Sequence, residues 1–560
     1  MISILRLISL RSGHEKIFPF KFKRSFFSNQ FKPFQNKLLE FPNNTAVIDD
    51  FGSFKYKDIL YSSFLLAKKI KSVIPESECG ERISFLCSSD ATYVSALLAC
   101  WLTGNVAVPL NANYPSALLE YFVKDSQSKL VIANERFRDP MQNIASQVNA
   151  SFFIIDRDIL TSPSRNNYNE IGRSEFCSWN SDMANRNALI IYTSGTTGQP
   201  KGVVLTHGIL HAQVSAVVQA WEISSKDSIL HTLPLHHIHG IMNGLLCPLN
   251  VGGCLVMRPK FIASEVWEYF LNTDKMKPDV NLYFAVPTMY AMLIREFDEK
   301  SKNNSNTRNR PLNNIRLMSS GSAALPEPVF YKWETITGHR LLERFGMSEI
   351  GMALSNPLNG PRIPGCVGNP LPKVEVKIQK ADDTSHETID IVFGNDSEVV
   401  VKPEYKGESG ELLIRGPNVF KEYWNKEKAT QESFTKDGWF KTGDTATYES
   451  GSFKILGRTS VDIIKSGGYK ISALQIESCI LLHPDVAECT VFGVPDDVWG
   501  ERVVAVVLLK KGKQLLDTDL KTWCQNHLPK YSVPSVFKFV DTIPRNVMGK
   551  VNKKELRLKF

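Results

Sequence analysis

The sequence predicts an α/β protein with more than one domain. Its 560 residues are too many for one ordinary domain. Helical patterns alternate with short apolar strands up to about residue 260, as in sheets that are covered by helices. A strand-rich region follows at 410–415 and 452–456, and the remaining residues carry helices and strands of their own. We therefore expect a large N-terminal part and a small C-terminal domain that begins near Gly457.

Several elements can be placed from the local pattern. A hairpin is expected over 46–56, because turn residues at 50–53 separate two apolar stretches. The continuous apolar run Ala188–Tyr192 predicts a buried strand. The polar segments 301–310 and 382–397 predict a surface loop and a polar insertion.

The stretch Ala91–Leu110 contains no charged residue and is long enough to span a bilayer. Gly104 and Pro109 interrupt it, however, and both residues end or break helices. We expect a buried helix that stops at Gly104, then a short strand at 106–110, and no transmembrane segment.

The N-terminus has the composition of a targeting segment. Residues 1–38 carry eight Lys and Arg against one acid, so they supply seven of the eight net positive charges of the chain. A leader that is basic, poor in acids and rich in hydroxyl and apolar residues is typical of a mitochondrial transit peptide. We therefore assign 1–38 to such a leader, with cleavage near 24–29 and a mitochondrial matrix location. A disordered basic tail is the alternative.

Composition excludes several other classes of protein. A hydrophobic content of 43% and a charged content of 22% are those of a soluble globular protein. The body beyond the leader is nearly neutral, so we expect no nucleic-acid partner. The ten cysteines form no CxxC pair, and no zinc or iron–sulfur site is expected.

A glycine- and hydroxyl-rich loop follows the Ala188–Tyr192 strand. Thr193–Gly202 reads Thr-Ser-Gly-Thr-Thr-Gly-Gln-Pro-Lys-Gly, which offers glycines for close approach, hydroxyl donors and the cation of Lys201. These groups suit phosphate. A Walker A loop is excluded, because Pro200 precedes the lysine and Gly202 follows it. Taken alone, the loop could also be a polar turn between strands.

With Tyr192, this loop resembles the most specific motif of the adenylate-forming superfamily, which contains acyl-CoA synthetases, luciferases and peptide-synthetase adenylation domains. The resemblance covers essentially the whole body, and the other motifs follow in the family's order. It implies a large N-terminal domain at 39–457 with a β-barrel-like subdomain, and a small mobile α+β domain at 458–560. The whole chain is thus expected to be a multidomain α/β fold, and we expect a monomer.

Four further segments carry the resemblance. Arg344-Phe-Gly-Met-Ser-Glu349 resembles the segment whose glutamate binds Mg²⁺, a cation that prefers oxygen ligands. Ser319–Pro326 resembles the loop that lines the adenine and acyl pocket, and Trp439–Asp444 resembles the motif whose Asp binds ribose. Pro544–Lys550 resembles the segment of the catalytic lysine. The implied ATP-binding residues are Thr193, Ser194, Gly195, Thr196, Thr197, Gly198, Lys201, Gly321, Phe345, Gly346, Met347, Ser348, Asp444 and Arg458.

The segment Ile463–Ser472 resembles the part of the family that presents CoA, and it implies CoA-binding roles for Ser466, Gly467 and Gly468. Just before it, the family has a hinge two residues after the arginine. That position is Ser460 here, and an extra residue precedes the glycines, so Ser460 and Asp462 both stay open as the pivot.

The implied reaction has two steps, with ATP, Mg²⁺ and CoA as cofactor and co-substrates. A carboxylate attacks the α-phosphate of ATP and gives an acyl-AMP and pyrophosphate; the CoA thiol then attacks the acyl carbon and releases AMP. Lys550, Glu349 and His237 are the implied catalytic residues. For His237 the implied role is to gate the acyl tunnel, and an inert core histidine is the alternative.

Arg344 indicates which class of acid is the substrate. Many fatty and aromatic acid activators have a small residue at this position, whereas a buried guanidinium beside an acyl pocket is costly unless an anion pairs with it. His239 and Ser322 could contact the same anion. The surrounding sequence resembles the malonate–CoA ligases, so we expect a small dicarboxylate, malonate or methylmalonate. The alternatives are a salt bridge of Arg344 to Glu343 or Glu349 and, for the enzyme, a medium-chain fatty acyl-CoA synthetase.

Overall fold

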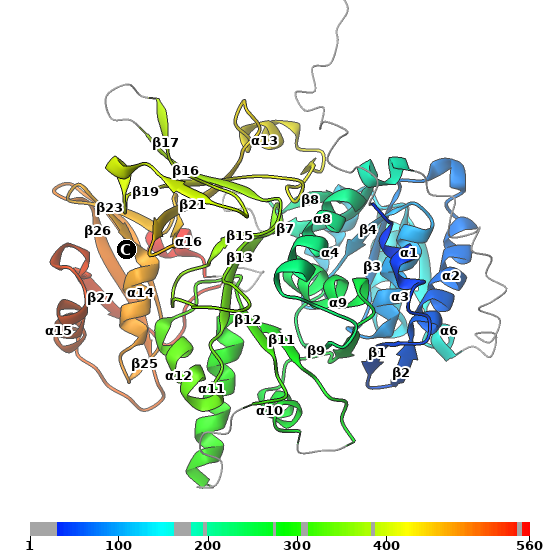
Figure 1. Cartoon of the computed structure of the whole chain (residues 1–560), viewed down its shortest axis with the longest axis horizontal. Coiled ribbons are helices and arrows are strands. Elements are labelled where there is room, and N and C mark those ends of the chain that lie inside the picture. The colour runs from blue at the N-terminus through cyan, green and yellow to red at the C-terminus, as the bar shows by residue number, and fades with distance from the viewer. Residues whose placement is uncertain are drawn as a thin grey trace, which may run out of the picture.

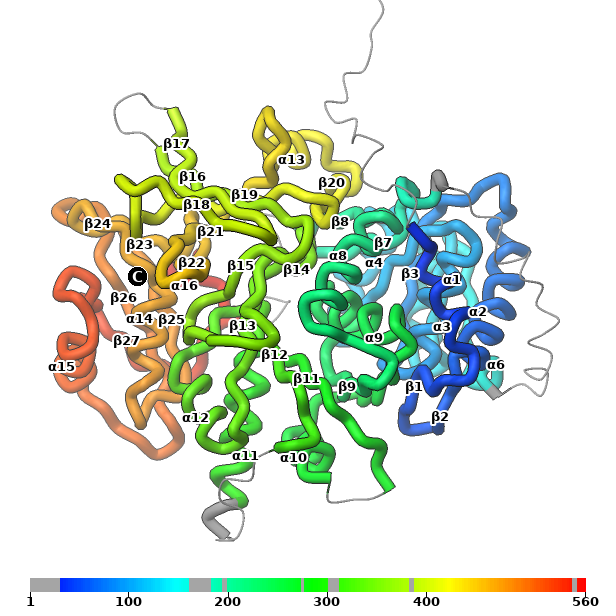
Figure 2. The backbone as a smooth tube through the Cα atoms, viewed as in Figure 1, coloured from blue at the N-terminus to red at the C-terminus, as the bar shows by residue number. Residues whose placement is uncertain are grey.

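The computed structural model describes residues 31–161, 181–193, 199–272, 276–303, 312–381, 387–545 and 551–559. Within these ranges the chain forms four β-sheets with helices packed around them (Figure 1). The chain runs from the blue N-terminal elements at one end of the molecule to the orange and red C-terminal elements at the other (Figure 2). The mixed α/β, multidomain fold expected from the sequence is confirmed.

The two strands that flank the phosphate loop belong to the seven-stranded sheet. Its core strands are parallel and almost entirely apolar, as expected for strands covered on both faces. In spatial order the strands are β20 (Glu422–Tyr423), β8 (Lys201–Thr206), β7 (Asn187–Thr193), β4 (Val106–Pro109), β3 (Arg82–Leu86), β5 (Leu130–Asn134) and β6 (Ser151–Ile155).

The nine-stranded sheet is parallel in its centre and ends in antiparallel pairs on both sides. In spatial order its strands are β15 (Asn369–Pro370), β14 (Gly351–Ser355), β13 (Leu342–Met347), β12 (Leu317–Ser320), β11 (Leu282–Ala285), β9 (Ser228–His231), β10 (Cys254–Met257), β1 (Thr45–Asp49) and β2 (Gly52–Lys55).

The third sheet is antiparallel and corresponds to the strand-rich region, and the fourth belongs to the C-terminal domain. The third contains β18 (Val399–Val401), β17 (Thr388–Gly394), β16 (Glu375–Ala381), β19 (Ser409–Arg415), β21 (Phe440–Glu449) and β22 (Ser452–Arg458). The fourth contains β24 (Tyr469–Ser472), β23 (Ile463–Ser466), β26 (Gly500–Leu509), β25 (Val486–Asp496) and β27 (Val536–Phe539).

Helices cover these sheets on both faces. The α-helices are α1 (Phe34–Leu38), α2 (Tyr56–Lys71), α3 (Ala91–Leu102), α4 (Ser116–Asp125), α5 (Arg138–Gln147), α6 (Asp158–Thr161), α8 (His207–Ala220), α9 (Cys247–Asn250), α10 (Ala263–Leu271), α11 (Pro287–Asn303), α12 (Glu327–Thr337), α13 (Glu427–Glu432), α14 (Ala473–Leu481), α15 (Asp517–His527) and α16 (Lys553–Arg557). The short helices are η2 (Glu76–Glu78), η3 (Glu135–Phe137), η5 (Ser181–Asn185), η6 (His239–Leu246), η8 (Pro403–Tyr405) and η9 (Lys530–Ser532).

Helices α3 and α8 lie between the two large sheets, because each contacts strands of both. Every residue of α3 is buried, which explains its apolar sequence without a membrane. The helix begins at Asp90, whose side chain accepts a hydrogen bond from the Thr92 amide. Trp101 Nε1 donates to the Ala188 carbonyl of β7 at 2.8 Å, and the Tyr93 hydroxyl donates to the Leu235 carbonyl at 2.6 Å. In the part of the chain that the structure describes, no helix is both long and apolar enough to cross a bilayer.

The hairpin at 46–56, the buried helix and strand at 91–110, and the strand at 188–192 are confirmed as β1–β2, α3–β4 and β7. The polar stretch 301–310 begins in α11, which continues to Asn303. The polar insertion 382–397 was only partly right, since it contains β17, whose Ile391 and Val392 are buried. Ile389, Ile391, Val392 and Phe393 make a short apolar pattern within this polar stretch, and such a pattern is typical of a strand.

Residues 34–38 pack into the large domain, although they fall within the segment 1–38 assigned to the leader. Leu38 in α1 is fully buried, and the Phe34 ring lies 5.7 Å from the Trp101 ring in an edge-on contact. Residues 1–30, where the cleavage site is expected, lie outside the described ranges. We therefore propose that the folded domain begins upstream of Phe34.

Candidate active site

The phosphate-loop motif connects β7 to β8 in an antiparallel hairpin, with Thr193 paired to Lys201. The predicted ATP-binding residues at 194–198 lie outside the described ranges. The base of the hairpin is firmly held: the Tyr192 hydroxyl donates to Asp125 Oδ2 at 2.8 Å, and the Tyr121 hydroxyl donates to the Pro200 carbonyl at 2.8 Å. The ends of the loop are therefore set by contacts to α4, which the sequence motif does not reveal.

Glu349 lies in the turn between β13 and β14, and its carboxylate is buried. The Tyr423 hydroxyl donates to Glu349 Oε1 at 2.8 Å, and the amide of Phe420 donates to the Glu349 carbonyl at 2.7 Å. The ammonium group of Lys201 lies over the ring of Tyr423, with Nζ 4.9 Å from the ring centre. Tyr423 thus joins two motif residues that are far apart in the sequence.

Sequence reasoning missed Tyr423. It belongs to the two-residue strand β20, which pairs with β8. Burial, together with the neighbouring Glu349, raises the pKa of Tyr423 well above its usual value, so the hydroxyl stays a hydrogen-bond donor. A single tyrosine in so short a strand has no recognisable signal in the sequence.

Phe345, Gly346, Met347 and Ser348 are half-buried at the end of β13, beside the buried Glu349. A side chain at Gly346 would overlap the carbonyl of Gly351 on the paired strand. Glycine is therefore required for the bulge that the β13–β14 ladder makes between Phe345 and Gly346.

Asp444 and Arg458 face each other on β21 and β22. Arg458 Nε lies 3.1 Å from Asp444 Oδ1, and its Nη1 donates to the Thr442 carbonyl at 2.6 Å. Burial raises the pKa of Asp444 to about 6; Arg458 opposes this rise, while Asp462 and Glu349 add to it. Glu349, the predicted Mg²⁺ ligand, is thus near enough to Asp444 to contribute to this rise in pKa.

Arg344 is buried on β13, with only 3% of its surface exposed. None of its three guanidinium nitrogens has a hydrogen-bond partner among the described residues. Burial lowers the pKa of Arg344 from 12.5 to about 9. A buried cation without a partner is unfavourable, so this position needs an anion.

The alternative, a salt bridge of Arg344 to Glu343 or Glu349, is not formed in the part of the chain that the structure describes. Glu343 Oε1 accepts the amide of Gly365 at 2.9 Å, and burial raises the pKa of Glu343 to about 8, so this carboxyl is protonated at neutral pH. Glu349 is bonded to Tyr423 instead. Neighbouring strand residues project to opposite faces, which separates Glu343 from Arg344.

Gly321, Ser322 and His239 meet Arg344, as the sequence predicts. Any side chain at Gly321 would overlap the guanidinium group, so glycine makes room for it. His239 Nδ1 lies 3.3 Å from Ser322 Oγ, and His239 Nε2 is buried without a hydrogen-bond partner in the described structure. Burial and the nearby Arg344 hold the pKa of His239 well below its usual value, so this ring is neutral. Ser322 has a φ of 69°, a left-handed conformation that is rare outside glycine and common at functional sites.

The histidine segment leads into η6, a π-helix, and such turns are frequent at functional sites. The rings of His236 and His237 lie 4.0 Å apart, and His236 Nε2 is 3.1 Å from Asn111 Nδ2. His237 is half-buried here. Its gating role stays a prediction.

The remaining predicted residues lie on the C-terminal domain. Ser466, Gly467 and Gly468 form the tip of the β23–β24 hairpin, where both glycines have positive φ, as a tight two-residue turn requires. The glycines are exposed. Lys550 lies outside the described ranges. Among the described residues, no group of three or more His, Cys, Asp or Glu side chains could hold a metal ion.

The described residues therefore include the two ends of a phosphate-type loop, the buried carboxylate of Glu349, the Asp444–Arg458 pair and the buried guanidinium of Arg344. The chain belongs to the AMP-binding enzyme family: that family matches residues 34–424, and the AMP-binding enzyme C-terminal domain matches 475–550.

Particular relatives can be named within this family. The chain is 46% identical to a Xenopus laevis protein named "Malonate--CoA ligase ACSF3, mitochondrial", over 93% of this chain and 90% of that protein. It is 44% identical to the human protein of the same name, over 94% and 92% of the two chains. The crystal structure of ATP-bound MatB from Rhodopseudomonas palustris superposes with a TM-score of 0.79 at 30% identity, covering 94% of this chain and 98% of that chain. The expected likeness to the malonate–CoA ligase called acyl-CoA synthetase family member 3 is confirmed.

Proposed function

We propose that this protein is an AMP-forming acid–thiol ligase that activates malonate. In the first step a malonate oxygen attacks the α-phosphate of ATP, which gives malonyl-AMP and pyrophosphate. In the second step the CoA thiol attacks the acyl carbon, and malonyl-CoA and AMP are released. Membership of the AMP-binding enzymes and relatives named malonate–CoA ligases support this proposal.

We infer the substrate acid from the guanidinium group of Arg344, which has no hydrogen-bond partner among the described residues. Malonate has two carboxylates, so one can react while the other pairs with Arg344. His239 Nε2 and Ser322 lie beside Arg344 and can contact the same carboxylate. A medium-chain fatty acid would place methylene groups against this buried cation and leave it uncompensated, which makes the alternative enzyme class unfavourable. Methylmalonate keeps both carboxylates and stays a possible substrate.

We assign the remaining roles as follows. Thr193–Gly198 and Lys201 bind the phosphates, Asp444 and Arg458 bind ribose, and Gly321 with Phe345–Ser348 borders the adenine and acyl groups. Lys550 stabilises charge on the α-phosphate during adenylation, and His237 gates the acyl tunnel. Ser466, Gly467 and Gly468 receive CoA. Charge neutralisation and alignment are the main tasks, because both reactants of the first step are anions.

Glu349 fits the Mg²⁺ that ATP would bring. Its Oε1 is bonded to Tyr423, so Oε2 is the oxygen that faces a cation, and one protein carboxylate is typical where phosphate oxygens supply the other ligands. When bound, the ion would neutralise phosphate charge. Tyr423 and the Glu349 turn hold the carboxylate in place for that role.

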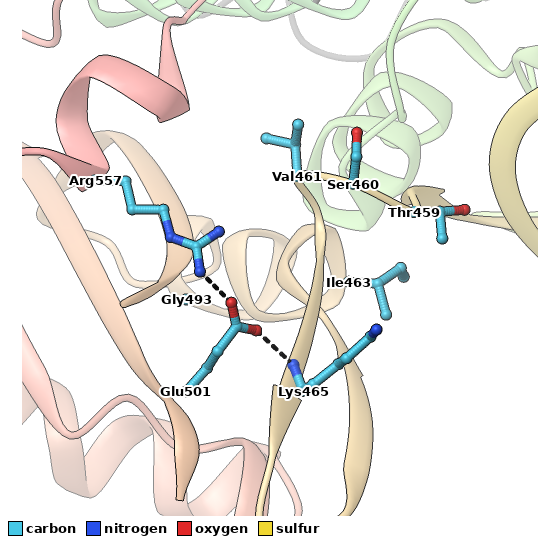
Figure 3. Close-up of a pocket in the computed structure, with 8 residues that line it drawn as sticks. All are labelled: Thr459, Ser460, Val461, Ile463, Lys465, Gly493, Glu501 and Arg557. Atoms are coloured by element: carbon cyan, nitrogen blue, oxygen red, sulfur yellow. Dashed lines mark hydrogen bonds and ion pairs between the residues drawn. The ribbon is translucent and has the colours of Figure 1, made fainter. Parts of the chain in front are cut away.

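The small domain would rotate between the two steps, and we place the pivot at Ser460. Thr459 is tied to the large domain, since its amide donates to the Gly443 carbonyl at 2.9 Å. Asp462 is bonded on both sides: its carbonyl accepts the Ala473 amide of the small domain at 2.7 Å, and its own amide donates to the Arg458 carbonyl of β22 at 2.7 Å. Ser460 lies exposed between these two anchors and lines the pocket shown in Figure 3. We also propose a monomer in the mitochondrial matrix, with a leader that ends before Phe34 and with domains that meet at 457–458.

A panel of acids tests the proposal. The purified protein is mixed with ATP, Mg²⁺, CoA and malonate, methylmalonate, succinate, butyrate or octanoate, and AMP release is measured. We expect the highest kcat/KM with malonate or methylmalonate. Faster turnover of butyrate or octanoate would show that Arg344 does not select the acid.

A further inference from the structure

A buried histidine ends the apolar strand β9. His231 has only 1% of its surface exposed, and its Nε2 lies 3.0 Å from the carbonyl oxygen of Gly240. A carbonyl oxygen can only accept a hydrogen bond, so Nε2 carries a proton and donates it. Burial lowers the pKa of His231, although the bond to Gly240 partly opposes this effect, and the ring is neutral.

The backbone of His231 is fixed by the nine-stranded sheet. Strand β9 lies between β11 and β10 and is parallel to both. His231 is aligned with Met257 of β10, and its carbonyl accepts the Arg258 amide at 3.0 Å. The imidazole donor is therefore presented from a rigid element rather than from a loop.

The ring of His231 packs directly against η6, the π-helix that follows the histidine segment. A side chain at Gly244 would overlap this ring, and a side chain at Gly240 would overlap the Pro234 carbonyl. Glycine at both positions lets η6 approach the strand and the preceding loop closely. His231 thus holds η6 by contact as well as by a hydrogen bond.

Gly240 directly follows His239, the first residue of η6 and a predicted contact of the acid. The contact of the His239 side chain to Ser322 is long, with Nδ1 3.3 Å from Oγ. Both Arg344 and His231 are near enough to His239 to lower its pKa. The position of the His239 ring beside Arg344 therefore depends on where the backbone of η6 begins, and His231 bonds to that backbone one residue further on.

We propose that His231 is a positioning residue for recognition of the acid. Through the Gly240 carbonyl it fixes the start of η6 and directs His239 to the carboxylate that pairs with Arg344. A histidine that only stabilised the domain would affect all acids equally, whereas this role affects acids with a second carboxylate. The inference rests on the proposed function.

The test compares malonate with butyrate in His231→Phe, which keeps a planar ring but has no donor; the assay measures AMP release. We expect kcat/KM for malonate to fall about tenfold through loss of the hydrogen bond. The kcat/KM for butyrate and the KM for ATP should stay within about threefold of wild type, because neither needs His239. His231→Gln, whose amide can donate to the same carbonyl, should restore most of the malonate activity. Equal losses with both acids would overturn the proposal.

His339→Phe is the matched control. His339, just before β13, also donates from Nε2 to a backbone carbonyl, that of Leu312 at 2.9 Å. This variant removes the same kind of bond without touching η6, so the ratio of malonate to butyrate turnover should not change. A change as large as that in His231→Phe would show that the loss is a general effect of destabilisation.

A double-mutant cycle with His239→Ala tests the route from His231 to the acid. Once His239 is removed, His231→Phe should lower malonate turnover by less than about twofold more. Losses that multiply in the double variant would show that His231 does not act through His239.

His231→Phe leaves the buried Gly240 carbonyl without this donor and could fail to fold. Gly244→Ala keeps the imidazole, but its methyl group displaces the ring from the carbonyl. We expect it to fold, by circular dichroism, and to show the same selective loss; a folded variant with unchanged preference for malonate would refute the inference. If the wild type prefers butyrate to malonate, the proposed function fails. If it prefers malonate and His231→Phe keeps that preference, the inference on His231 alone fails.

Discussion

Replacement of Arg344 tests the choice of acid most directly. The pKa of Arg344 falls from 12.5 to about 9, which corresponds to about 5 kcal/mol of unfavourable free energy for the charged form at this buried position. A bound carboxylate offsets this cost. Removing one partner of a buried ion pair costs roughly 3–5 kcal/mol, so Arg344→Gly should lower kcat/KM for malonate by roughly 10²- to 10⁴-fold.

The assay measures AMP release with malonate and with butyrate. We expect butyrate turnover to survive in Arg344→Gly, because butyrate does not need the cation. Arg340→Gln on the exposed surface is the matched control and should leave both activities unchanged. A malonate loss below tenfold, or equal losses with the two acids, would refute the reasoning.

A second variant separates binding from folding. Arg344→Met keeps much of the side-chain volume but removes the unpaired charge, so the ligand-free protein should become more stable by about 1–3 kcal/mol. Malonate should raise the thermal midpoint of the wild type and not that of this variant. A variant less stable than the wild type would show that Arg344 is compensated in the free protein.

The other predictions concern the ATP side of the site. Lys550→Ala should lose acyl-AMP formation but still convert supplied malonyl-AMP to the thioester; normal pyrophosphate release would contradict its assignment. Tyr423→Phe removes the hydrogen bond to Glu349, so adenylation should fall about tenfold and require more Mg²⁺; an unchanged Mg²⁺ titration would contradict this. Burial raises the pKa of Asp444 from 3.8 to about 6, so the ionised carboxylate disfavours the folded state. The protonated carboxyl group therefore contributes folding stability that is complete below pH 3.8 and is lost as the pH rises through 6. Asp444→Asn should therefore be about 3 kcal/mol more stable than wild type at pH 7.5, with a smaller difference at pH 5, in urea unfolding; a pH-independent difference would contradict the cause.

The secondary-structure elements that could be predicted from the sequence are those with a clear local pattern. The strand before the phosphate loop, the helix and strand at 91–110 and the hairpin at 46–56 all follow from periodicity and turn residues that are adjacent in the chain. The predictions that failed concern short elements within stretches of another character. Strand β17 is a short apolar pattern in a stretch that is otherwise polar, and α1, although its Leu38 is buried, adjoins the basic leader.

The candidate site also has features that the sequence predicted and features that it left open. Arg344, Gly321, Ser322 and His239 were predicted as neighbours from motif resemblance, and the structure brings them together. The salt bridge of Arg344 to Glu343 stayed open because the sequence does not show which partner Glu343 finds in the fold; the structure pairs Glu343 with the Gly365 amide, 22 positions away.

The sequence by itself determined the α/β class, the order of the motifs and hence the chemistry of adenylation, because each motif is a run of neighbouring residues. Only the tertiary structure decided that Arg344 has no hydrogen-bond partner among the residues described, that Tyr423 joins Lys201 to Glu349, and that Lys553 pairs with Asp462. The hydrogen bonds of Tyr423 and Lys553 connect residues 74 and 91 positions apart. Such contacts depend on how the sheets and the small domain pack, and no local pattern encodes them.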